Sequence, residues 1–463
     1  MSADAVIETG LSPWRAEIGA TLRLAGPLAL ANLLQMAVYA SDVIFVARLG
    51  EDSLAASSLG ASLFMLITWG FTSLTGAVAP LIAAELGRKT HSVREVRRTM
   101  RMALWLAAVC AAVGVVLCQF GEALMLATGQ QPHIAAMAQQ FLTVLSFALL
   151  PMIASNVLRV FVSAMGRPTF ATAITALAIV VNVIGNLALV FGMFGAPALG
   201  LVGSALSSCI TAVVTLIAYV VAIQADRRMR RTFIWGRWWR PEWRRLKVLL
   251  ALGIPIALTV VAEGGLFGGA AFLMGRIDPV QLAGHAIALQ VAAAFFQIPY
   301  GIGQAATIRV GFHYGAGDRA AMGRAGWAAL GTGLATQVIA AAAILLAPRL
   351  ILSAYIDVSA PANASLMAHA VQFLLVAAAF QLFDGIQTIA AGALRGLQDT
   401  RMPMVIALSG YWLCGFVIAA WLGLTTPLEG VGVWLGLMAG LVVVSALLLR
   451  RWMRRGALGL VPA

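Results

Sequence analysis

The stretch VLLALGIPIALTVVAEGGLFGGAAFLMG, residues 248 to 275, decides the fold class of this chain because it contains a single charged side chain. A helix needs only about 20 apolar residues to cross the hydrocarbon layer of a membrane. The charged residue is Glu263, and a carboxylate among Val, Leu, Phe and Gly costs several kcal/mol unless it finds a partner or takes up a proton. The stretch therefore predicts a membrane span with an acid that needs an explanation.

The rest of the chain has the same character. Of its 463 residues, 61% are hydrophobic and 11% are charged, whereas a soluble domain is about 25% charged. Apolar segments long enough to span a membrane lie at roughly 20–46, 54–84, 102–121, 134–163, 169–193, 199–223, 248–275, 282–312, 325–347, 364–394, 402–425 and 429–449. We predict an all-α polytopic membrane protein with twelve transmembrane helices.

The basic residues predict the orientation of the chain. There are 31 Lys and Arg against 18 Asp and Glu, an excess that by itself is compatible with nucleic-acid binding. All but Arg48, Arg276 and Arg349 are placed in the N-terminus, the even-numbered loops or the C-terminal tail, so we expect both termini on the cytoplasmic side of the inner membrane. Topology and contact with the lipid bilayer then explain the charge, and no nucleic-acid partner is expected.

A shift of 228 residues aligns the chain with itself. It pairs Pro27 with Pro255 and Arg48 with Arg276, as expected for a duplicated six-helix unit. Because six is an even number, both copies start on the same side, and the two lobes should be parallel and pseudo-symmetric about the membrane normal.

The duplication predicts the domain boundaries. We expect an N-lobe over residues 1–223, a basic cytoplasmic linker over 224–247 and a C-lobe over 248–463. Transporters built from two such repeats bind their substrate between the lobes.

Three acidic residues fall clearly inside predicted spans, namely Asp42, Glu263 and Asp384, and no Lys or Arg is placed well inside a span to neutralise them. The 228-residue shift puts Glu263 on Gln35 and Asp42 on Ala270, so each lobe has its own acid. The plain alternative is that Asp42 caps a helix end and the other two bond to nearby backbone. Intramembrane carboxylates are rare and usually functional, which favours cation coupling.

Carboxylates without a fixed cation give a low-dielectric cavity a negative potential, so the cavity should bind cations. A proton, or a Na⁺ ion at Glu263 and Asp384, would exclude a cationic organic molecule from the same site, and this exclusion is the minimum requirement for antiport. Inward movement of the small ion gains about 2.3 kcal/mol per 100 mV of membrane potential. We predict secondary active efflux of cationic organic molecules, with no cofactor.

Further polar residues extend the candidate sites. Asn182 and Asn186 lie four residues apart on one helical face, where they could complete a cation site with Asp42 or bond to an adjacent helix. The candidate residues of a substrate cleft are Gln35, Met36, Tyr39, Trp69, Gln290 and Phe296. The substrate itself is not identified by the sequence.

Four stretches carry a family resemblance. They are SDVIFVARLGEDSLAA (41–56), AEGGLF (262–267), AGHAIALQVAAAFFQIPYGIGQAATIRVG (283–311) and FDGIQTIAAGALRGLQDT (383–400). The chain resembles the multidrug and toxic compound extrusion (MATE) family, NorM branch, over nearly its whole length. The resemblance implies drug export in exchange for Na⁺ or H⁺ through a V-shaped cleft. It also implies that Asp42 is the N-lobe acid and that Glu263 and Asp384 are the C-lobe cation pair.

Two residues depart from the family pattern. Asn186 stands where certain relatives have an acid, and Phe296 replaces a tyrosine that some sodium-coupled members place near the cation. These departures favour H⁺ slightly over Na⁺ as the coupling ion. We expect the protein to act as a monomer.

Other functions fit the sequence less well. A lipid-linked oligosaccharide flippase of the wider superfamily would need Arg or Lys in its cleft, where this chain has acids. A primary pump would need the phosphate-binding pattern GxxxxGK[ST], which the sequence lacks. A membrane-embedded enzyme would need polar clusters at the membrane surface, but the odd-numbered loops are short and nearly free of ionisable groups, so no enzymatic activity is expected.

Overall fold

The computed structural model describes residues 12–88, 92–236, 238–358 and 360–462, and within these ranges the secondary structure is helical without any strand. Residues 1–11 of the predicted N-lobe and Arg237 of the predicted linker lie outside the described residues. Among the described residues, eleven helices are long and apolar enough to cross a membrane, or twelve when one bent pair counts as a single span. The prediction of an all-α polytopic membrane protein is confirmed.

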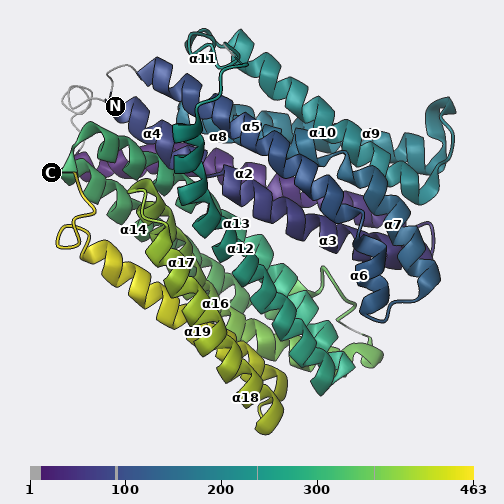
Figure 1. Cartoon of the computed structure of the whole chain (residues 1–463). Coiled ribbons are helices and arrows are strands. Elements are labelled where there is room, and N and C mark those ends of the chain that lie inside the picture. Colours follow the sequence, from purple (N-terminus) through teal and green to yellow (C-terminus); the bar gives the residue numbers. More distant parts are fainter. Residues whose placement is uncertain (1–11, 89–91, 237, 359, 463) are drawn as a thin grey trace. The chain divides into compact units, whose positions relative to one another are not determined.

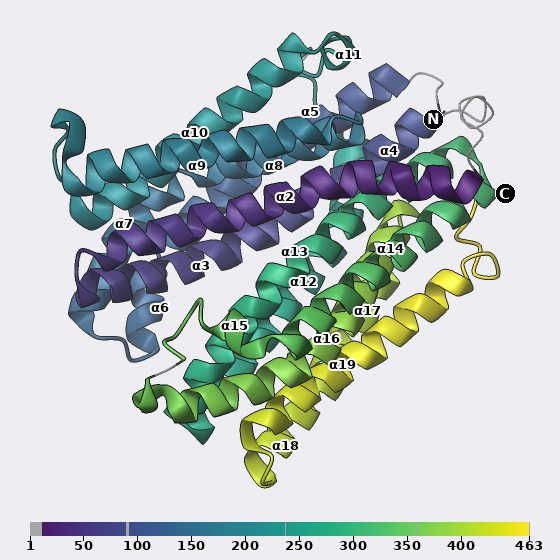
Figure 2. The same cartoon turned by 180° about the vertical axis from the view of Figure 1, so that it is seen from behind.

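The elements follow one another along the chain as shown in Figures 1 and 2. They are α2 (Pro13–Ala47), α3 (Glu51–Thr75), α4 (Val78–Arg88), α5 (Ser92–Cys118), α6 (Gly121–Ala127), α7 (Pro132–Ser146), α8 (Leu149–Ala164), α9 (Pro168–Phe191), η1 (Met193–Gly195), α10 (Gly200–Ala225), α11 (Arg227–Arg230), α12 (Trp243–Ile277), α13 (Pro279–Ala316), α14 (Arg319–Leu346), α15 (Pro348–Leu352), η2 (Pro361–Asn363), α16 (Ala364–Gly396), α17 (Arg401–Leu408), η3 (Ser409–Phe416), α18 (Val417–Thr425) and α19 (Glu429–Met453).

The predicted span over residues 134–163 is a pair of helices, α7 and α8, bent by 47°. Pro151, in the first turn of α8, has no N–H to donate to the carbonyl of Phe147 four residues earlier, so the helical hydrogen-bond ladder is interrupted at this point. The apolar composition of the segment indicated a span, and the bend follows from this proline.

Contacts group the residues into two compact units. Unit 1 comprises Met1–Ala29 and Leu258–Ala463, and unit 2 comprises Leu30–Ala257. The two division points lie inside helices α2 and α12 and are related by the same 228-residue shift that pairs Pro27 with Pro255. The lobes and linker expected at 1–223, 224–247 and 248–463 stay a prediction, because the contact units divide two helices and not the loops.

Each unit has its own apolar core. In unit 2, α8 is central and buries Ile153, Val157 and Phe161 completely. In unit 1, Trp434 on α19 is fully buried and its ring lies edge-on to that of Phe380 on α16, with the ring centroids 5.6 Å apart. Large apolar side chains elsewhere point outward, as expected for helices that face lipid.

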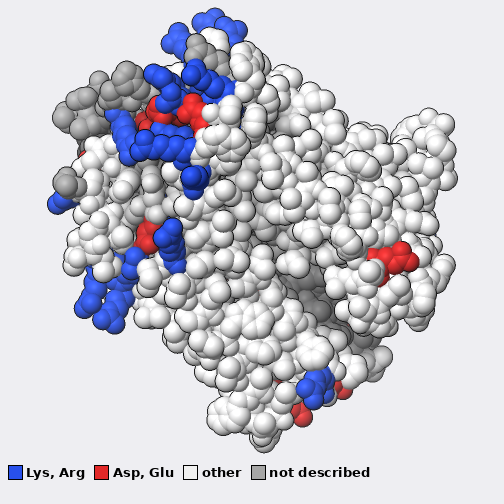
Figure 3. Space-filling model, in the orientation of Figure 1, with Lys and Arg blue, Asp and Glu red and all other residues white. Residues whose placement is uncertain are grey.

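Charged side chains bind the segment before α12 to the rest of unit 2. Arg101 on α5, almost fully buried, donates to Glu242 at 2.9 Å, and Arg98 lies 3.0 Å from the same carboxylate. Arg245 pairs with Glu85 at 3.2 Å and also with Glu95. Figure 3 shows that Lys and Arg side chains (blue) gather around Asp and Glu side chains (red) below the place of α11 in Figure 1.

The sequence placed no Lys or Arg well inside a span, and the structure shows two arginines within helices of the predicted spans. Arg159 lies within α8 and donates to the Asn32 carbonyl on α2. Arg309 lies within α13 and makes two hydrogen bonds, of 2.8 and 2.7 Å, to the carboxylate of Glu17. A long guanidinium side chain can stay buried when it reaches a polar or acidic partner, and sequence position alone did not reveal these partners.

Candidate functional site

In unit 2, Asp42 is surrounded by hydrogen-bond donors from two other helices. On α9, the side-chain amides of Asn182 and Asn186 donate to Asp42 Oδ1 at 2.9 and 2.8 Å, and on α10 the hydroxyl of Ser208 donates to Oδ2 at 3.0 Å. The structure thus brings together the three residues that the sequence proposed for this site. Ser208 was missed, because serines are common in apolar helices and nothing in its spacing pointed to Asp42.

A close approach of α9 and α10 fixes this arrangement. A Cβ atom at Gly185 would lie 2.4 Å from the Ser207 hydroxyl oxygen, so a larger residue at this position would force the Ser207 side chain to move. Asn182 and Asn186 have no exposed surface, and Ser41 donates to Asn182 Oδ1 at 2.5 Å. Among the described residues, the Asn186 carboxamide oxygen has no hydrogen-bond donor.

The unit 2 site is therefore made of oxygen ligands and neutral donors. One carboxylate, two carboxamides and hydroxyl groups form the kind of ligand set that hard cations prefer. The same donors stabilise the carboxylate of Asp42 without any bound ion, since each carboxylate oxygen already accepts at least one hydrogen bond.

In unit 1, two acids share a single amide group. Gln387 Nε2 lies 3.2 Å from Asp384 Oδ1 and 3.4 Å from Glu263 Oε1, and thereby bridges α16 and α12. The hydroxyl of Tyr411, on the π-helical segment η3, donates to Gln387 Oε1 at 2.6 Å. The carbonyl end of Gln387 is thus held by Tyr411, and its NH₂ end faces both carboxyl groups.

Three residues of this cluster are buried, and Glu263 is half-buried. The exposed fractions of Asp384, Gln387 and Tyr411 are 5%, 4% and 2%. The helix that carries Asp384 packs tightly on α13, where a Cβ atom at Gly392 would lie 2.4 Å from the carbonyl oxygen of Gly303. Such backbone contact holds α16, and with it Asp384 and Gln387, in a fixed position.

Sequence reasoning missed both Gln387 and Tyr411. Gln387 follows Asp384 by three residues and so shares its helical face, a spacing that could have indicated the contact. Tyr411 lies on a different helix, and only the fold reveals that its hydroxyl reaches Gln387.

Arg395, in the last turn of α16, carries a positive charge that acts on this cluster. Its guanidinium attracts Glu263 electrostatically. Among the ion pairs of the described residues, however, none includes Glu263 or Asp384. Glu263 is therefore attracted by the charge of Arg395, but neither Glu263 nor Asp384 has an ion-pair partner in the described part of the chain.

The residues expected in a cleft fall into both units. On α2 in unit 2, Gln35, Met36 and Tyr39 are half-buried, and Tyr39 shares a hydrogen bond with Gln35 and lies within the electrostatic range of Asp42. Trp69 on α3 is 49% exposed.

The other two of the six residues expected in a cleft belong to unit 1. Gln290 on α13 is exposed, and Phe296 on the same helix is half-buried and stacks on Tyr300 with the ring centroids 5.7 Å apart. A substrate cleft formed by all six residues stays a prediction.

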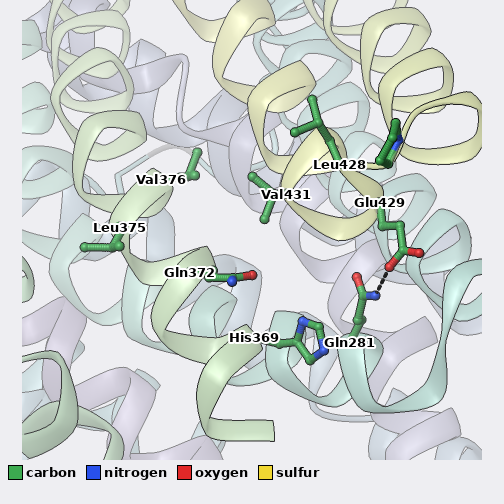
Figure 4. A pocket seen from close by; sticks show the side chains of 9 residues that line it. Gln281, His369, Gln372, Leu375, Val376, Leu428, Glu429 and Val431 are labelled. Atoms are coloured by element: carbon green, nitrogen blue, oxygen red, sulfur yellow. Dashed lines mark hydrogen bonds between the residues drawn. The ribbon is translucent and has the colours of Figure 1, made fainter. Parts of the chain in front are cut away.

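A cavity of about 490 Å³ lies elsewhere in unit 1, between α13, α16 and α19, and Figure 4 shows side chains that line it. Gln281 donates to Glu429 across it and accepts a hydrogen bond from the Gly430 N–H at 2.9 Å. None of the sequence-predicted residues lines this cavity. In the described ranges no cluster of three or more His, Cys, Asp and Glu side chains could hold a metal ion, and the expectation of no cofactor stays a prediction.

Comparison with known families decides the identity of the chain. The sequence model of the MatE family matches twice, at residues 27–188 and 255–421. The chain belongs to the MatE family. The two matches begin 228 residues apart, in agreement with the internal duplication found in the sequence.

Curated relatives place this MatE protein in the NorM branch. It is 44% identical over 443 residues to the "Probable multidrug resistance protein NorM" of Mesorhizobium japonicum, covering 96% of this chain and 95% of that protein. It is 37% identical over 434 residues to the "Multidrug resistance protein NorM" of Burkholderia vietnamiensis, covering 93% of each chain. The protein is thus a multi-pass membrane transporter, and the predicted family and branch are confirmed.

Solved structures show the same fold. One is the outward-facing conformation of a multidrug resistance MATE family transporter, with a TM-score of 0.86, 19% identity and coverage of 96% of this chain and 97% of that one. Another is the eukaryotic MATE transporter AtDTX14, with a TM-score of 0.83, 18% identity and coverage of 96% and 98%. The twelve-helix, two-lobe MATE fold predicted from the sequence is confirmed.

Proposed function

We propose that this MatE protein exports cationic amphipathic compounds in exchange for H⁺ or Na⁺. The names of its NorM relatives support drug export. The observation that carries the proposed ion coupling is the Glu263–Gln387–Asp384 cluster, in which two acids share one neutral amide and have no ion pair with any residue that the structure describes.

Electrostatics explains why this cluster should take up a cation. Two ionised carboxyl groups beside one amide repel each other in a medium of low dielectric constant, and the single NH₂ group of Gln387 offsets only part of that repulsion. A proton or a Na⁺ ion between Glu263 and Asp384 would relieve it, and so would an organic cation. Only one of these cations can relieve the same repulsion at a time, so binding of drug and binding of coupling ion compete.

The Asp42 cluster is proposed as a second ion site. Asn186 Oδ1 is buried without a donor in the described structure, so this oxygen is available to a cation beside the Asp42 carboxylate. Because Asn186 is neutral where certain relatives have an acid, the site attracts Na⁺ less strongly. We therefore favour H⁺ slightly as the coupling ion.

We further infer an alternating-access mechanism in which α2 and α12 bend. Both helices pass from one compact unit to the other, and each crosses the boundary three residues after a proline, at Pro27 and Pro255. Proline inside a helix removes a hydrogen bond and permits a kink. The remaining expectations belong to the same proposal: a substrate cleft lined by the six residues named above, a monomer with both termini cytoplasmic, and neither nucleic-acid binding nor enzymatic activity.

Transport into proteoliposomes tests the proposed function. The purified protein is reconstituted, a fluorescent organic cation is added outside, and an acidic lumen or a sodium-rich lumen is imposed separately. An antiporter should accumulate the dye when the coupling ion can leave the lumen, and we expect the larger effect with the acidic lumen. Equal accumulation with neither gradient, or none with either gradient, would contradict the proposal.

A further inference from the structure

A second cavity lies in unit 2, where α4, α5 and α8 approach α11. Its volume is about 340 Å³. It is lined by Leu86, Ser92, Val93, Val96, Met165, Arg228, Arg231 and Thr232. One part of the wall is thus basic, with two arginines and a serine hydroxyl, and the other part is apolar.

The acids near this cavity already have partners. Asp226 lies 3.3 Å from Arg167 and accepts the N–H groups of Met229 and Arg228, and these hydrogen bonds hold the pKa of Asp226 below its usual range. Glu95 on α5 is paired with Arg98 and Arg245.

The cavity arginines, in contrast, lack a dedicated acidic partner. In the described part of the chain, the Arg231 guanidinium takes part in no hydrogen bond or ion pair, and that of Arg228 contributes only a weak attraction to Asp226. Both arginines are exposed to solvent, and their positive charge at the wall of the cavity is not offset by an ion-pair partner among the described residues.

Hydrogen bonds hold the backbone around the cavity in place. The Arg97 guanidinium donates to the backbone carbonyl of Thr232 at 3.1 Å, and the Thr232 hydroxyl donates to the carbonyl of Met229 at 2.6 Å. These bonds fix the chain that follows α11 against α5. Ser92 is the first residue of α5, whose first-turn N–H groups add to the positive potential at this end of the cavity.

We propose that this cavity binds the phosphodiester headgroup of an anionic phospholipid such as phosphatidylglycerol. Guanidinium groups match the geometry of phosphate oxygens, and the Ser92 hydroxyl provides a third donor. Leu86, Val93 and Met165 offer an apolar surface to the glycerol and to the first part of an acyl chain. Inorganic phosphate shares the headgroup chemistry but gains nothing from this apolar surface, and so a lipid fits better.

The location of the cavity supports a membrane lipid as the bound molecule. The cavity lies at the arginine-rich ends of the helices, the side that we propose to be cytoplasmic, where anionic lipids attract basic segments. This inference does not depend on the transport proposal, because no residue of the two acid clusters lines the cavity.

The chain offers a matched control for the test. Arg230 is exposed and lies in the same short helix as Arg228, but it does not line the cavity. Arg228→Gln, Arg231→Gln and Arg230→Gln therefore remove the same charge from the same region, and only the first two change the cavity. Native mass spectrometry of the full chain in detergent, titrated with phosphatidylglycerol or phosphatidylcholine, measures the affinity for each lipid.

We expect the wild type and Arg230→Gln to bind one phosphatidylglycerol in preference to phosphatidylcholine. Arg228→Gln and Arg231→Gln should each weaken it about tenfold, the loss expected for one charge-assisted hydrogen-bonded contact. Equal weakening in Arg230→Gln would show nonspecific attraction and overturn the proposal. Displacement of the lipid by inorganic phosphate, but not by chloride at equal ionic strength, would overturn the lipid as occupant.

A further variant tests the apolar wall. Val93 is 43% exposed, so Val93→Trp should fold while its larger side chain fills part of the cavity. We expect this variant to lose phosphatidylglycerol binding with an unchanged melting temperature. Unchanged lipid binding in Val93→Trp would overturn the proposed role of the cavity.

Discussion

The two acid clusters differ in how their carboxyl groups are satisfied. Asp42 in unit 2 is a single acid that receives hydrogen bonds from Asn182, Asn186 and Ser208. In unit 1, Glu263 and Asp384 depend on one amide, that of Gln387, at longer distances. The first cluster can hold a carboxylate without a bound ion, whereas the second needs a cation to offset the repulsion between its acids.

This difference suggests a division of roles. A site that is stable both with and without a bound ion can tune affinity, but a site that is unstable when empty can drive the exchange of one cation for another. We therefore expect substitutions in the unit 1 cluster to affect transport most strongly. Changes in the unit 2 cluster should act mainly on ion preference.

The largest effect is expected for Asp384→Asn. The substitution keeps the shape of the side chain but leaves one acid in the cluster, so the repulsion that couples drug to ion disappears. We expect loss of gradient-driven dye accumulation in proteoliposomes while the protein remains folded and extractable.

Glu429→Gln is the matched control for that loss. Glu429 is also an acid of unit 1, but it lies in the cavity of Figure 4 with Gln281 and outside the acid pair. Its substitution should leave dye accumulation close to that of the wild type. Full transport in Asp384→Asn would remove Asp384 from the mechanism.

The second prediction makes the unit 2 cluster resemble that of unit 1. In Asn186→Asp, the amide that donates to Asp42 at 2.8 Å becomes a second acid, and attraction is replaced by repulsion. The variant should be less stable than the wild type at neutral pH in the absence of sodium. A bound ion should restore stability by about 1.4 kcal/mol at a concentration ten times its dissociation constant.

Thermal unfolding in sodium chloride and in choline chloride of equal ionic strength measures this effect. Sodium should raise the melting temperature of Asn186→Asp more than choline does, and the wild type should show a smaller difference between the salts. If the two salts act equally on the variant, the oxygen atoms around Asp42 do not form a sodium site.

Sequence patterns predicted the fold more completely than they predicted the sites. Twelve apolar segments and a 228-residue repeat predicted two six-helix lobes, since span length and duplication are properties of the chain itself, and the resemblance of four stretches identified the MATE family. The i, i+4 spacing of Asn182 and Asn186 placed both on one face, and the structure directs that face to Asp42. Contacts between helices distant in sequence, such as those of Arg159 and Tyr411, depend on packing that no local spacing encodes.

Tyr411→Phe gives the smallest expected change and isolates the role of the shared amide. Loss of the phenol hydroxyl removes the hydrogen bond to Gln387 Oε1, so the amide can turn its carbonyl oxygen toward Glu263 and Asp384. A net hydrogen bond contributes about 1 kcal/mol, which corresponds to roughly a fivefold change in affinity for the competing organic cation. Equilibrium binding of the fluorescent cation to the purified protein at several pH values measures it.

The direction of that change discriminates between two roles for Tyr411. If the hydroxyl orients Gln387, a turned amide presents an oxygen to both acids, and cation binding in Tyr411→Phe should strengthen and depend more steeply on pH. If Tyr411 serves only as packing, its ring is retained in phenylalanine and both the affinity and the pH profile should match the wild type. If the pH profile of cation binding shifts in Tyr411→Phe and not in the Glu429→Gln control, the orientation of the Gln387 amide contributes to the electrostatic balance between the two acids.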